Sequence, residues 1–555
     1  MTCQRTCGDN GALTRKYSRR FLAATGVATI ALILASCGED ASSPTGPPNA
    51  SADQAYLAEV VNGRLSYRLF ANTGETNAVN ILPDFSHAGY QGGGVALPTV
   101  PVRMTIGPQS GDNRQAIQSA IDAVSAMAPD GTGFRGAVLL LRGRYEVGGQ
   151  LTVRTSGVVL RGEGQGEGGT VLVDTLATNH DSLLRITGSG SGFGEIAGTR
   201  TAITDSYVPT GTRTFGVQSA GTFAVGDSVV VLRTPNQTWI DELAMGQYGW
   251  TASGYAIGHE RRVAAVSGSQ LTLDIPIVDP ITTRYGGGVV YKNNFPGRIE
   301  RCGVENLRFE SVYASATDED HGWKAIVLNR AANSWVTDVT ARYFAYSAVS
   351  IEGRSIFNTV QNTAMLDHKS QITGGRRYSF NLDDSTANLF QRCYTREGRH
   401  DFVTGSQTPG PNVFLDSLAE QTHDDIGPHH RWATGLLFDN IKGGLIRVQN
   451  RGASGTGHGW AGAQTLFWNL QASRNIKVES PRGAMNWGVG CVGSVREGAG
   501  TWERYGQRVE PRSLYLKQLE DRLGAGAVSQ VTTAAQRSGV VWDQLAAWAG
   551  SGRLP

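Results

Sequence analysis

The chain has 555 residues, a net charge of +2 and only 18% charged residues, so it could form several domains or one long repetitive domain. It contains no basic block, which argues against a nucleic-acid partner. Glycine occurs 72 times without a collagen period, and this frequency favours many tight turns between short strands.

Residues 1–36 have the pattern of an export signal rather than of a folded segment. Arg19 and Arg20 precede an apolar run at 21–34, which is short for a spanning helix. The arginine pair resembles a twin-arginine signal, and the Leu-Ala-Ser-Cys that ends the run resembles a bacterial lipobox. This resemblance implies cleavage before Cys37, a lipid on its thiol and a membrane anchor in the cell envelope. An uncleaved anchor is the alternative.

The next part of the chain combines one helical pattern with several short strands. Ile117, Ile121 and Val124 fall on one face of a helix. The glycine-bounded runs GAVLLLRGRYEV (136–147) and GVVLRGEGQG (157–166) follow, and both are typical of short strands.

Asp84-Phe85-Ser86 comes before this helix, and the order of that motif, the helix and the strands resembles the N-terminal part of pectate-lyase-superfamily proteins, over residues 80–175. The resemblance implies an all-β fold, a right-handed parallel β-helix whose first coil is capped by the helix. Because that superfamily includes lyases, hydrolases and phage tailspikes, the resemblance does not choose the reaction.

Residues 200–293 interrupt the pattern of coils. Runs at 225–232 and 270–274 are typical of antiparallel strand pairs, so we expect a small inserted β-subdomain. Trp239 and Trp250 lie between these runs and fit either a sugar-stacking platform or core packing.

One apolar position recurs in the second half of the chain. A repeated apolar position at such a period predicts a solenoid with coils of about 24 residues. The interval from Val360 to Phe390 is longer than the others, which predicts an enlarged coil with the extra residues in a loop at 367–377. The members of the series are Val336, Val360, Phe390, Phe414 and Phe438.

The same register predicts two charged columns on the outside of neighbouring coils. Coils lie about 4.8 Å apart, so like charges in one column need a counter-charge. A ladder of solvated salt bridges is the structural alternative. The first column holds Arg377, Asp401 and Asp425, the second holds Arg376, His400 and Asp424, and Arg399 aligns with His423.

Five of the ten histidines lie between residues 396 and 462. His429, His430, Arg431 and Trp432 are consecutive. Imidazole transfers protons near neutral pH, guanidinium binds carboxylates, and indole offers a face to a sugar ring. This combination favours a catalytic or sugar-binding site. His458 and Trp460 follow in a glycine-rich segment, which fits either a wall of that site or a plain turn.

We favour a polysaccharide lyase that cleaves a uronate-containing glycan by β-elimination. That reaction needs a carboxylate neutraliser, a base and an acid. The candidate neutralisers are Arg399, Arg431, Arg376 and Arg377; the candidate bases are His400, His429 and His430; the candidate acids are Tyr378, a second histidine and Lys369. Asp424 and Asp425 complete the catalytic candidates. We assign substrate binding to Arg376, Arg377, Lys369, Asp401, His423, Trp432, His458 and Trp460.

Two other functions fit the same residues. An inverting glycoside hydrolase would use Asp401 with Asp424 or Asp425, across about 6.5–9.5 Å. A glycan-binding adhesin would use the surface without catalysis. No cofactor is expected, although the carboxylates of Asp401, Asp424 and Asp425 could hold Ca²⁺.

The expected organisation has six parts, and we expect a monomer that acts on an acidic polysaccharide. The parts are an export signal at 1–36, a tether at 37–54, N-terminal coils at 55–199, the insertion at 200–293, the main coils at 294–500 and a helical cap at 501–555.

Overall fold

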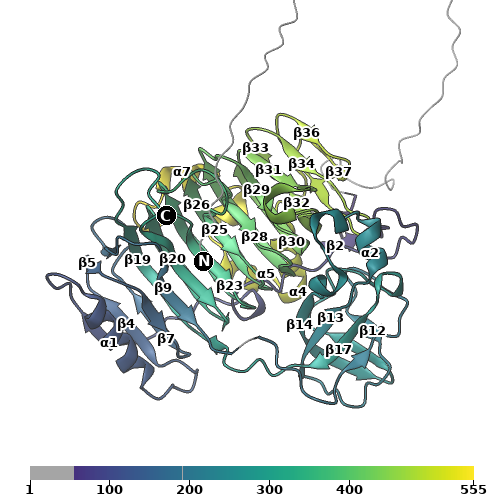
Figure 1. Cartoon of the computed structure of the whole chain (residues 1–555), viewed down its shortest axis with the longest axis horizontal. Coiled ribbons are helices and arrows are strands. Elements are labelled where there is room, and N and C mark those ends of the chain that lie inside the picture. Colours follow the sequence, from purple (N-terminus) through teal and green to yellow (C-terminus); the bar gives the residue numbers. More distant parts are fainter. Residues whose placement is uncertain (1–55, 191) are drawn as a thin grey trace, which may run out of the picture. The chain divides into compact units, whose positions relative to one another are not determined.

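The computed structural model describes residues 56–190 and 192–555 (Figure 1). The expected export signal, the lipidation site Cys37 and the tether therefore lie outside the described residues. Within the described part, no helix is long and apolar enough to cross a membrane.

Two long sheets of parallel strands form the body of the chain, and the chain crosses from one to the other in every coil (Figure 1). The 15-stranded sheet contains β3 (Val102–Ile106), β4 (Gly136–Leu140), β5 (Gly143–Val147), β7 (Val158–Arg161), β8 (Thr170–Asp174), β19 (Gly303–Ser311), β22 (Trp335–Arg342), β24 (Thr359–Leu366), β26 (Leu389–Arg396), β28 (Pro409–Glu420), β30 (Ala433–Gly443), β32 (Gly462–Trp468), β33 (Gln471–Ala472), β35 (Trp487–Val489) and β37 (Thr501–Glu503). The 10-stranded sheet contains β6 (Leu151–Val153), β9 (His180–Thr187), β20 (Gly322–Asn329), β23 (Ser347–Glu352), β25 (Phe380–Leu382), β27 (Phe402–Thr404), β29 (Asp425–Pro428), β31 (Leu445–Val448), β34 (Ile476–Val478) and β36 (Arg496–Glu497). The predicted parallel β-helix is confirmed.

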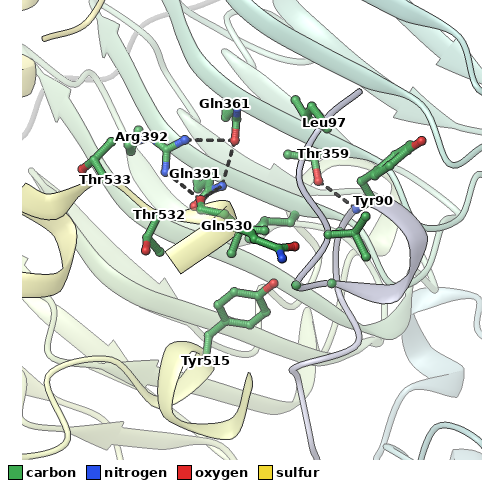
Figure 2. A pocket seen from close by; sticks show the side chains of 16 residues that line it. Tyr90, Leu97, Thr359, Gln361, Gln391, Arg392, Tyr515, Gln530, Thr532 and Thr533 are labelled. Carbon is green, nitrogen blue, oxygen red and sulfur yellow. Dashed lines mark hydrogen bonds between the residues drawn. The ribbon is translucent and has the colours of Figure 1, made fainter. Parts of the chain in front are cut away.

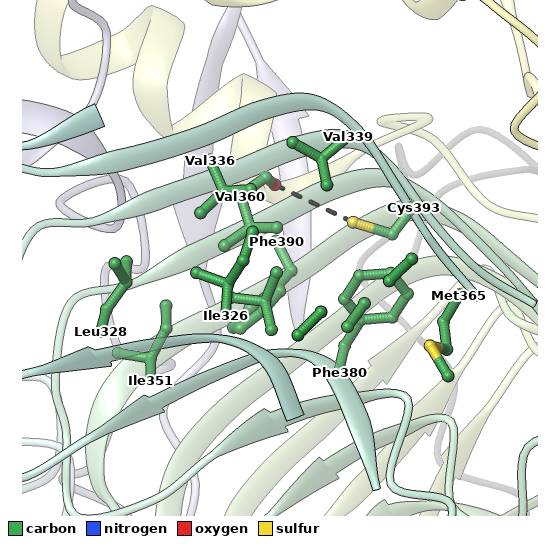
Figure 3. Packing of buried hydrophobic residues seen from close by; sticks show 14 of the residues in the cluster. Ile326, Leu328, Val336, Val339, Ile351, Val360, Met365, Phe380, Phe390 and Cys393 are labelled. Carbon is green, nitrogen blue, oxygen red and sulfur yellow. Dashed lines mark hydrogen bonds between the residues drawn. The ribbon is translucent and has the colours of Figure 1, made fainter. Parts of the chain in front are cut away.

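The repeated apolar position is the interior stack of this β-helix. Val336 pairs with Val360, Val360 with Phe390, Phe390 with Phe414, and Phe414 with Phe438. The rings of Phe390, Phe414 and Phe438 stack with centroids 5.0 and 4.9 Å apart. Residues of the 10-stranded sheet, such as Ile326 and Phe380, close the same core from the opposite side (Figure 3).

An asparagine ladder fixes the turn that enters the 15-stranded sheet. The Oδ1 atoms of Asn358, Asn388 and Asn412 accept the backbone N–H of the equivalent residue one coil earlier, at 2.9, 3.1 and 3.0 Å. All three side chains are fully buried. The ladder thus satisfies backbone donors that the turn would otherwise bury without partners.

Helix α1 (Arg114–Ser125) covers the first coil, as predicted. Its Ile117, Ala120, Ile121 and Val124 are buried in the same core as the interior stack.

The predicted inserted subdomain is an antiparallel sheet between the early and main coils. Its strands are β10 (Thr201–Ala202), β17 (Gly288–Lys292), β13 (Ser228–Arg233), β14 (Gly258–Ser267), β15 (Gln270–Leu273) and β12 (Thr214–Gly216), with β11 (Tyr207–Val208) paired to β16 (Ile281–Thr282) and a helix α2 (Gln237–Glu242). Trp239 and Trp250 are buried in one cluster with Trp432, so core packing is the role that the structure gives them. Two further strand pairs are β1 (Ala58–Val61) with β2 (Arg64–Tyr67), and β18 (Ile299–Glu300) with β21 (Ala331–Ala332).

The C-terminal helices were expected to cover the last coil. They lie instead along the side of the β-helix, against the 15-stranded sheet. Leu415 and Leu437 of the 15-stranded sheet point outward, and Tyr515 and Leu519 bury them. Both faces of this sheet are therefore apolar, and the outer face needs a cover. The helices are α4 (Leu514–Leu523), α5 (Ala525–Val531), α6 (Ala534–Ser538) and α7 (Trp542–Trp548); a short helical turn, α3 (Ser454–Gly457), precedes His458.

Candidate active site

The register of the 10-stranded sheet differs from the predicted register at the enlarged coil. Phe380 pairs with Phe402, and Val403 pairs with Gly427, so the first of these two intervals is the shorter. The columns are therefore Ser379–Asp401–Asp425 and Tyr378–His400–Asp424. The prediction that Arg377 and Arg376 belong to these columns is wrong. It assumed the regular period after the 367–377 loop, whereas the interval from Phe380 to its partner Phe402 is shorter than that period.

The basic residues of the 367–377 loop have partners away from the histidines. Arg376 forms an ion pair with Glu319, with 2.6 Å between Nε and Oε1. Buried Arg377 donates to the Ser370 carbonyl at 2.7 Å. The ammonium of Lys369 lies 5.0 Å from the centroid of the Tyr313 ring.

Asp401 is a buried structural carboxyl rather than part of an outer column. Its Oδ1 accepts hydrogen bonds from the hydroxyls of Ser379 and Thr395, both at 2.8 Å. Burial raises the pKa of Asp401 to about 6. The hydrolase pairing of Asp401 with Asp424 or Asp425 therefore loses its first member, since this carboxyl faces into the coil.

Trp432 and His423 also lie outside the cluster of histidines. Trp432 is 1% exposed, packs edge-on against Trp239 at 4.8 Å and donates its Nε1–H to Asp279 at 3.0 Å. A buried indole has no face for a sugar ring, so a stacking role for Trp432 is not supported. His423 is exposed.

The other four histidines of this part of the chain gather into one cluster. His400 precedes β27, His429 and His430 follow β29, and His458 follows α3. Ring centroids are 4.0 Å apart for His400 and His429, 4.7 Å for His429 and His430, and 4.5 Å for His430 and His458. Tyr378 packs edge-on against His400 at 5.1 Å. Adjacent coils thus bring residues that are distant in sequence into contact.

Asp425, on the next coil, contacts the ring of His400. The Nδ1 of His400 lies 2.7 Å from the carbonyl oxygen and 2.9 Å from Oδ1 of Asp425, while its Nε2 makes no hydrogen bond. Arg451 binds the other carboxylate oxygen at 2.6 Å. Burial alone would raise the pKa of Asp425, but Arg451 and His400 hold this pKa below its ordinary value. The Asp425 carbonyl therefore fixes the His400 ring through a hydrogen bond, and the ionised Asp425 carboxylate lies beside the same ring nitrogen.

Burial controls the charge of the cluster. It lowers the pKa of His430 to about 3 and that of His458 to about 4, and it holds the pKa of His429 far below its ordinary value. These imidazoles are neutral at neutral pH. Burial also raises the pKa of Tyr378 to about 12, so the phenol remains protonated.

The edge of the cluster carries the charged residues that solvent reaches. The Asp424 side chain is 36% exposed, and Arg399 Nη2 lies 3.3 Å from Asp424 Oδ2. Arg431 is half-buried and donates to Thr456 in the loop that leads to His458. Trp460, also half-buried, closes this loop by pairing with Asn450.

A second set of acidic residues on the same sheet was not predicted from the sequence. Ile351 pairs with Leu382, which places Glu352 next to Asp383 on adjacent strands. Lys324 Nζ lies 2.7 Å from Glu352 and 3.0 Å from Asp181. Burial, together with the charge of Glu352, raises the pKa of Asp383 to about 6. The two carboxyls are separated in sequence by the enlarged coil, so the regular period does not align them.

Potential metal ligands converge at two places in the described chain. The ligand atoms of His429, His430 and His458 lie within 4.8 Å of one another, and so do those of His400, Asp425 and His429. The Asp401–Asp424–Asp425 set proposed for Ca²⁺ does not form such a group among the described residues.

A small cavity of about 120 Å³ lies on the other side of the molecule, at the outer face of the 15-stranded sheet (Figure 2). Gln391, Arg392 and Tyr515 line it. Gln391 and Arg392 both donate to Gln361 at 2.9 Å, so its polar side chains are used in packing contacts.

No family model matches the sequence, and no curated protein matches it. Among solved structures, the chain is similar to the tailspike gp61 of Pseudomonas phage phi297, with 14% identity, a TM-score of 0.41, and coverage of 71% of this chain and 66% of that one. It is similar to the polygalacturonase of Erwinia carotovora, with 9% identity, a TM-score of 0.36, and coverage of 75% and 98%. It is also similar to pectate lyase Pel9A, with 8% identity, a TM-score of 0.37, and coverage of 82% and 92%.

The chain spans about two thirds of the length of the phage tailspike. The identification of the fold rests on the strand pairing of the chain itself. By that pairing it is a parallel β-helix, the fold that its resemblance to the pectate lyase superfamily predicted.

Proposed function

We propose that the chain is a polysaccharide lyase that cleaves a uronate-containing glycan by β-elimination. The observation that carries the proposal is the contact chain from Asp425 through His400 to Tyr378, with arginines at its solvent edge. An imidazole beside a carboxylate is a suitable base, and a protonated phenol is a suitable acid.

The proposed roles follow from these contacts. His400 Nε2 takes the proton from C5 of the uronate, and the electron pair of that bond forms the C4–C5 double bond. The C4–O4 bond breaks, and Tyr378 gives its phenolic proton to the leaving oxygen. Arg399 and Arg431 bind the uronate carboxylate, whose neutralisation makes the C5 proton more acidic.

Access to His400 requires movement of the segment above it. His400 and Tyr378 are buried, His429 packs on His400, and His458 packs on His429 at 5.2 Å. The turn before His458 is exposed at 453–456 and contains Gly455 at φ 57°. A glycine in the left-handed region gives this turn a freedom that suits displacement by a polymer.

The test is incubation with uronate polymers of different composition, using two readouts. A lyase raises ultraviolet absorbance through the unsaturated uronate and forms new reducing ends in equal number. The matched control is the same polymer with its carboxyls reduced to alcohols, which we expect to stay intact. New reducing ends without the ultraviolet signal would contradict elimination.

Glu352 and Asp383 support glycoside hydrolysis as a second candidate function. They are neighbouring carboxyls whose surroundings differ: Glu352 is paired with Lys324, and the pKa of Asp383 is raised to about 6. Such a difference is typical of a general acid and its partner. Hydrolysis predicts reducing ends without unsaturated product, and their loss in Asp383→Asn. Binding of the glycan without any product would favour an adhesin instead.

We also propose that the enzyme is exported and anchored through a lipid on Cys37. The lipobox-like Leu-Ala-Ser-Cys in the sequence supports this proposal. Metabolic labelling with a fatty acid should mark the wild-type protein in the membrane fraction. Cys37→Ser should lose both the label and the membrane association; a labelled Cys37→Ser protein would contradict the proposal.

A further inference from the structure

We propose that His429, His430 and His458 together bind one divalent transition-metal ion of the zinc type. The proposal concerns binding only and does not depend on the proposed elimination. It is carried by the geometry of the three imidazoles and by the buried nitrogens of His429 and His458 that make no hydrogen bond.

The three rings already surround a common point. Their ligand atoms lie within 4.8 Å of one another. The His430 and His458 rings stand nearly perpendicular at 84°, and the His429 and His458 rings at 64°. Zinc–nitrogen bonds of about 2.0–2.1 Å in a tetrahedral site place the donor atoms roughly 3.3–3.4 Å apart. Small rotamer adjustments would bring the three imidazole nitrogens to these distances. Two adjacent residues at the end of β29 and one residue from the next coil supply the donors.

Two of the donor rings have buried nitrogens that nothing in the protein satisfies. The Nδ1 atoms of His429 and His458 are both buried and make no hydrogen bond. Leaving a buried polar atom without a partner is costly, so native structures usually give such an atom a partner. A metal ion bound by this cluster would give these rings the partner that they lack.

The competing set of His400, Asp425 and His429 also contains buried atoms without a hydrogen bond, at His400 Nε2 and Asp425 Oδ1, but its carboxylate already has close contacts within the protein. The carboxylate of Asp425 is already bound by Arg451 at 2.6 Å and by His400 at 2.9 Å. A metal ion there would have to displace one of these contacts. At the histidine trio, the Arg451 charge is offset by the same Asp425.

The three imidazole donors favour a zinc-type ion and leave one of its coordination positions open. Imidazole nitrogens suit zinc, copper and nickel, whereas Ca²⁺ prefers oxygen donors. Three protein ligands leave a fourth coordination position free. His430 is half-buried rather than buried, and Arg431 lies beside it. This environment favours an anionic fourth ligand, such as hydroxide or a carboxylate.

The test uses the full chain, freed of metal with a chelator and titrated with Zn²⁺ in a calorimeter and with Co²⁺ in a spectrophotometer. We expect one ion per chain at the trio and a cobalt spectrum of nitrogen ligands, without the intense thiolate bands that cysteine ligation would produce. His430→Gln and His458→Gln should each weaken zinc binding by at least about tenfold. Loss of a residue that only hydrogen-bonds to a metal ligand already costs about that much, and loss of a ligand itself should cost more. His423→Gln, a change at an exposed histidine outside the cluster, should bind as the wild type does.

Each other outcome overturns the proposal. No binding by the wild type would do so, as would unchanged affinity in both trio variants. Binding that survives His458→Gln but is lost in Asp425→Asn would place the ion at the other set. If the variants do not fold by circular dichroism, X-ray absorption of the zinc-loaded wild type decides: three imidazoles support the site, and fewer refute it.

Discussion

Asp401 and Asp425 occupy equivalent positions on neighbouring coils, yet the pKa values of their carboxyl groups are shifted in opposite directions. Asp401 has only hydroxyl partners, so burial raises its pKa to about 6. Asp425 is buried equally well, but Arg451 and His400 keep it ionised. At the scale of one residue, the partners rather than the position in the repeat decide the role.

Asp401→Asn should change how stability depends on pH. The pKa of Asp401 is raised in the folded state, so its stabilising contribution is present below the unfolded value of 3.8 and is lost as pH rises through about 6. Asparagine keeps an acceptor for Ser379 and Thr395 without a charge. The difference in unfolding free energy between variant and wild type should therefore grow in favour of the variant by up to about 3 kcal/mol between pH 4 and pH 7.

Denaturant unfolding at a series of pH values measures this difference. Asp424→Asn, at the exposed neighbour, is the matched control and should show a much smaller pH-dependent change. A difference for Asp401→Asn that stays constant with pH would contradict the raised pKa.

His400→Ala and Tyr378→Phe should each reduce kcat on a cleavable glycan by about 10²–10⁴, the usual range for loss of a general acid or base. Binding of an uncleaved oligosaccharide should persist, since the arginines remain. His423→Ala removes an exposed histidine from the same part of the chain and should leave kcat unchanged. If either active-site variant kept the wild-type kcat, the substituted residue would not be the base or the acid of the reaction.

The sequence indicated the histidine cluster but not its exact membership. The concentration of histidines between residues 396 and 462 suggested one site, and the structure brings His400, His429, His430 and His458 together. The burial of Trp432 and Asp401 was not predictable, because it depends on the inserted subdomain and on hydroxyls from another strand.

At the scale of the element, an interior apolar position recurs from coil to coil, and three successive turns are also held by Asn358, Asn388 and Asn412. The regular period was sufficient to predict both the coils and the stack of Phe390, Phe414 and Phe438. It failed at the enlarged coil, where the interval from Val349 to its partner Phe380 is long and the interval from Phe380 to Phe402 is short. The extra residues of the loop change the spacing between paired residues differently on the two sheets. A single period therefore cannot predict the register of both sheets.

Asn388→Ala should destabilise the fold by about 2–4 kcal/mol. The change removes the acceptor for the Asn358 backbone N–H at 3.1 Å and the donor to the Thr386 carbonyl at 2.9 Å, and it leaves both groups buried and unpaired. Denaturant titration measures the loss. Asn77→Ala, at an exposed asparagine, should change stability by less than about 0.5 kcal/mol. Equal effects of the two variants would mean that the ladder does not stabilise the turn.

At the scale of the whole molecule, the two long sheets have different surroundings on their outer faces. The C-terminal helices cover the 15-stranded sheet with apolar contacts, whereas the 10-stranded sheet carries the histidines, Tyr378 and the Glu352–Asp383 pair. Leu516, Leu519 and Leu523 fall on one helical face and predict a helix, but they do not show which surface it would cover.

Trp542→Ala should cost about 3–5 kcal/mol of unfolding free energy, as is usual for a buried aromatic residue. Trp542 packs with Tyr394 and Leu418 of the 15-stranded sheet, and its Nε1–H donates to the Asn440 carbonyl at 2.9 Å. Thermal and denaturant unfolding measure the change. Val540→Ala, at a neighbouring exposed position, should have little effect. A Trp542→Ala protein as stable as the wild type would show that the sheet does not need this cover.

We propose that the histidine-bearing surface of the 10-stranded sheet performs β-elimination on a uronate glycan. The most direct test is to measure, on one digest, the ultraviolet absorbance of unsaturated uronate against the number of new reducing ends. We expect one unsaturated end for each new reducing end, and loss of both in His400→Ala. Reducing ends without unsaturated product would contradict this proposal and would transfer the chemistry to Glu352 and Asp383.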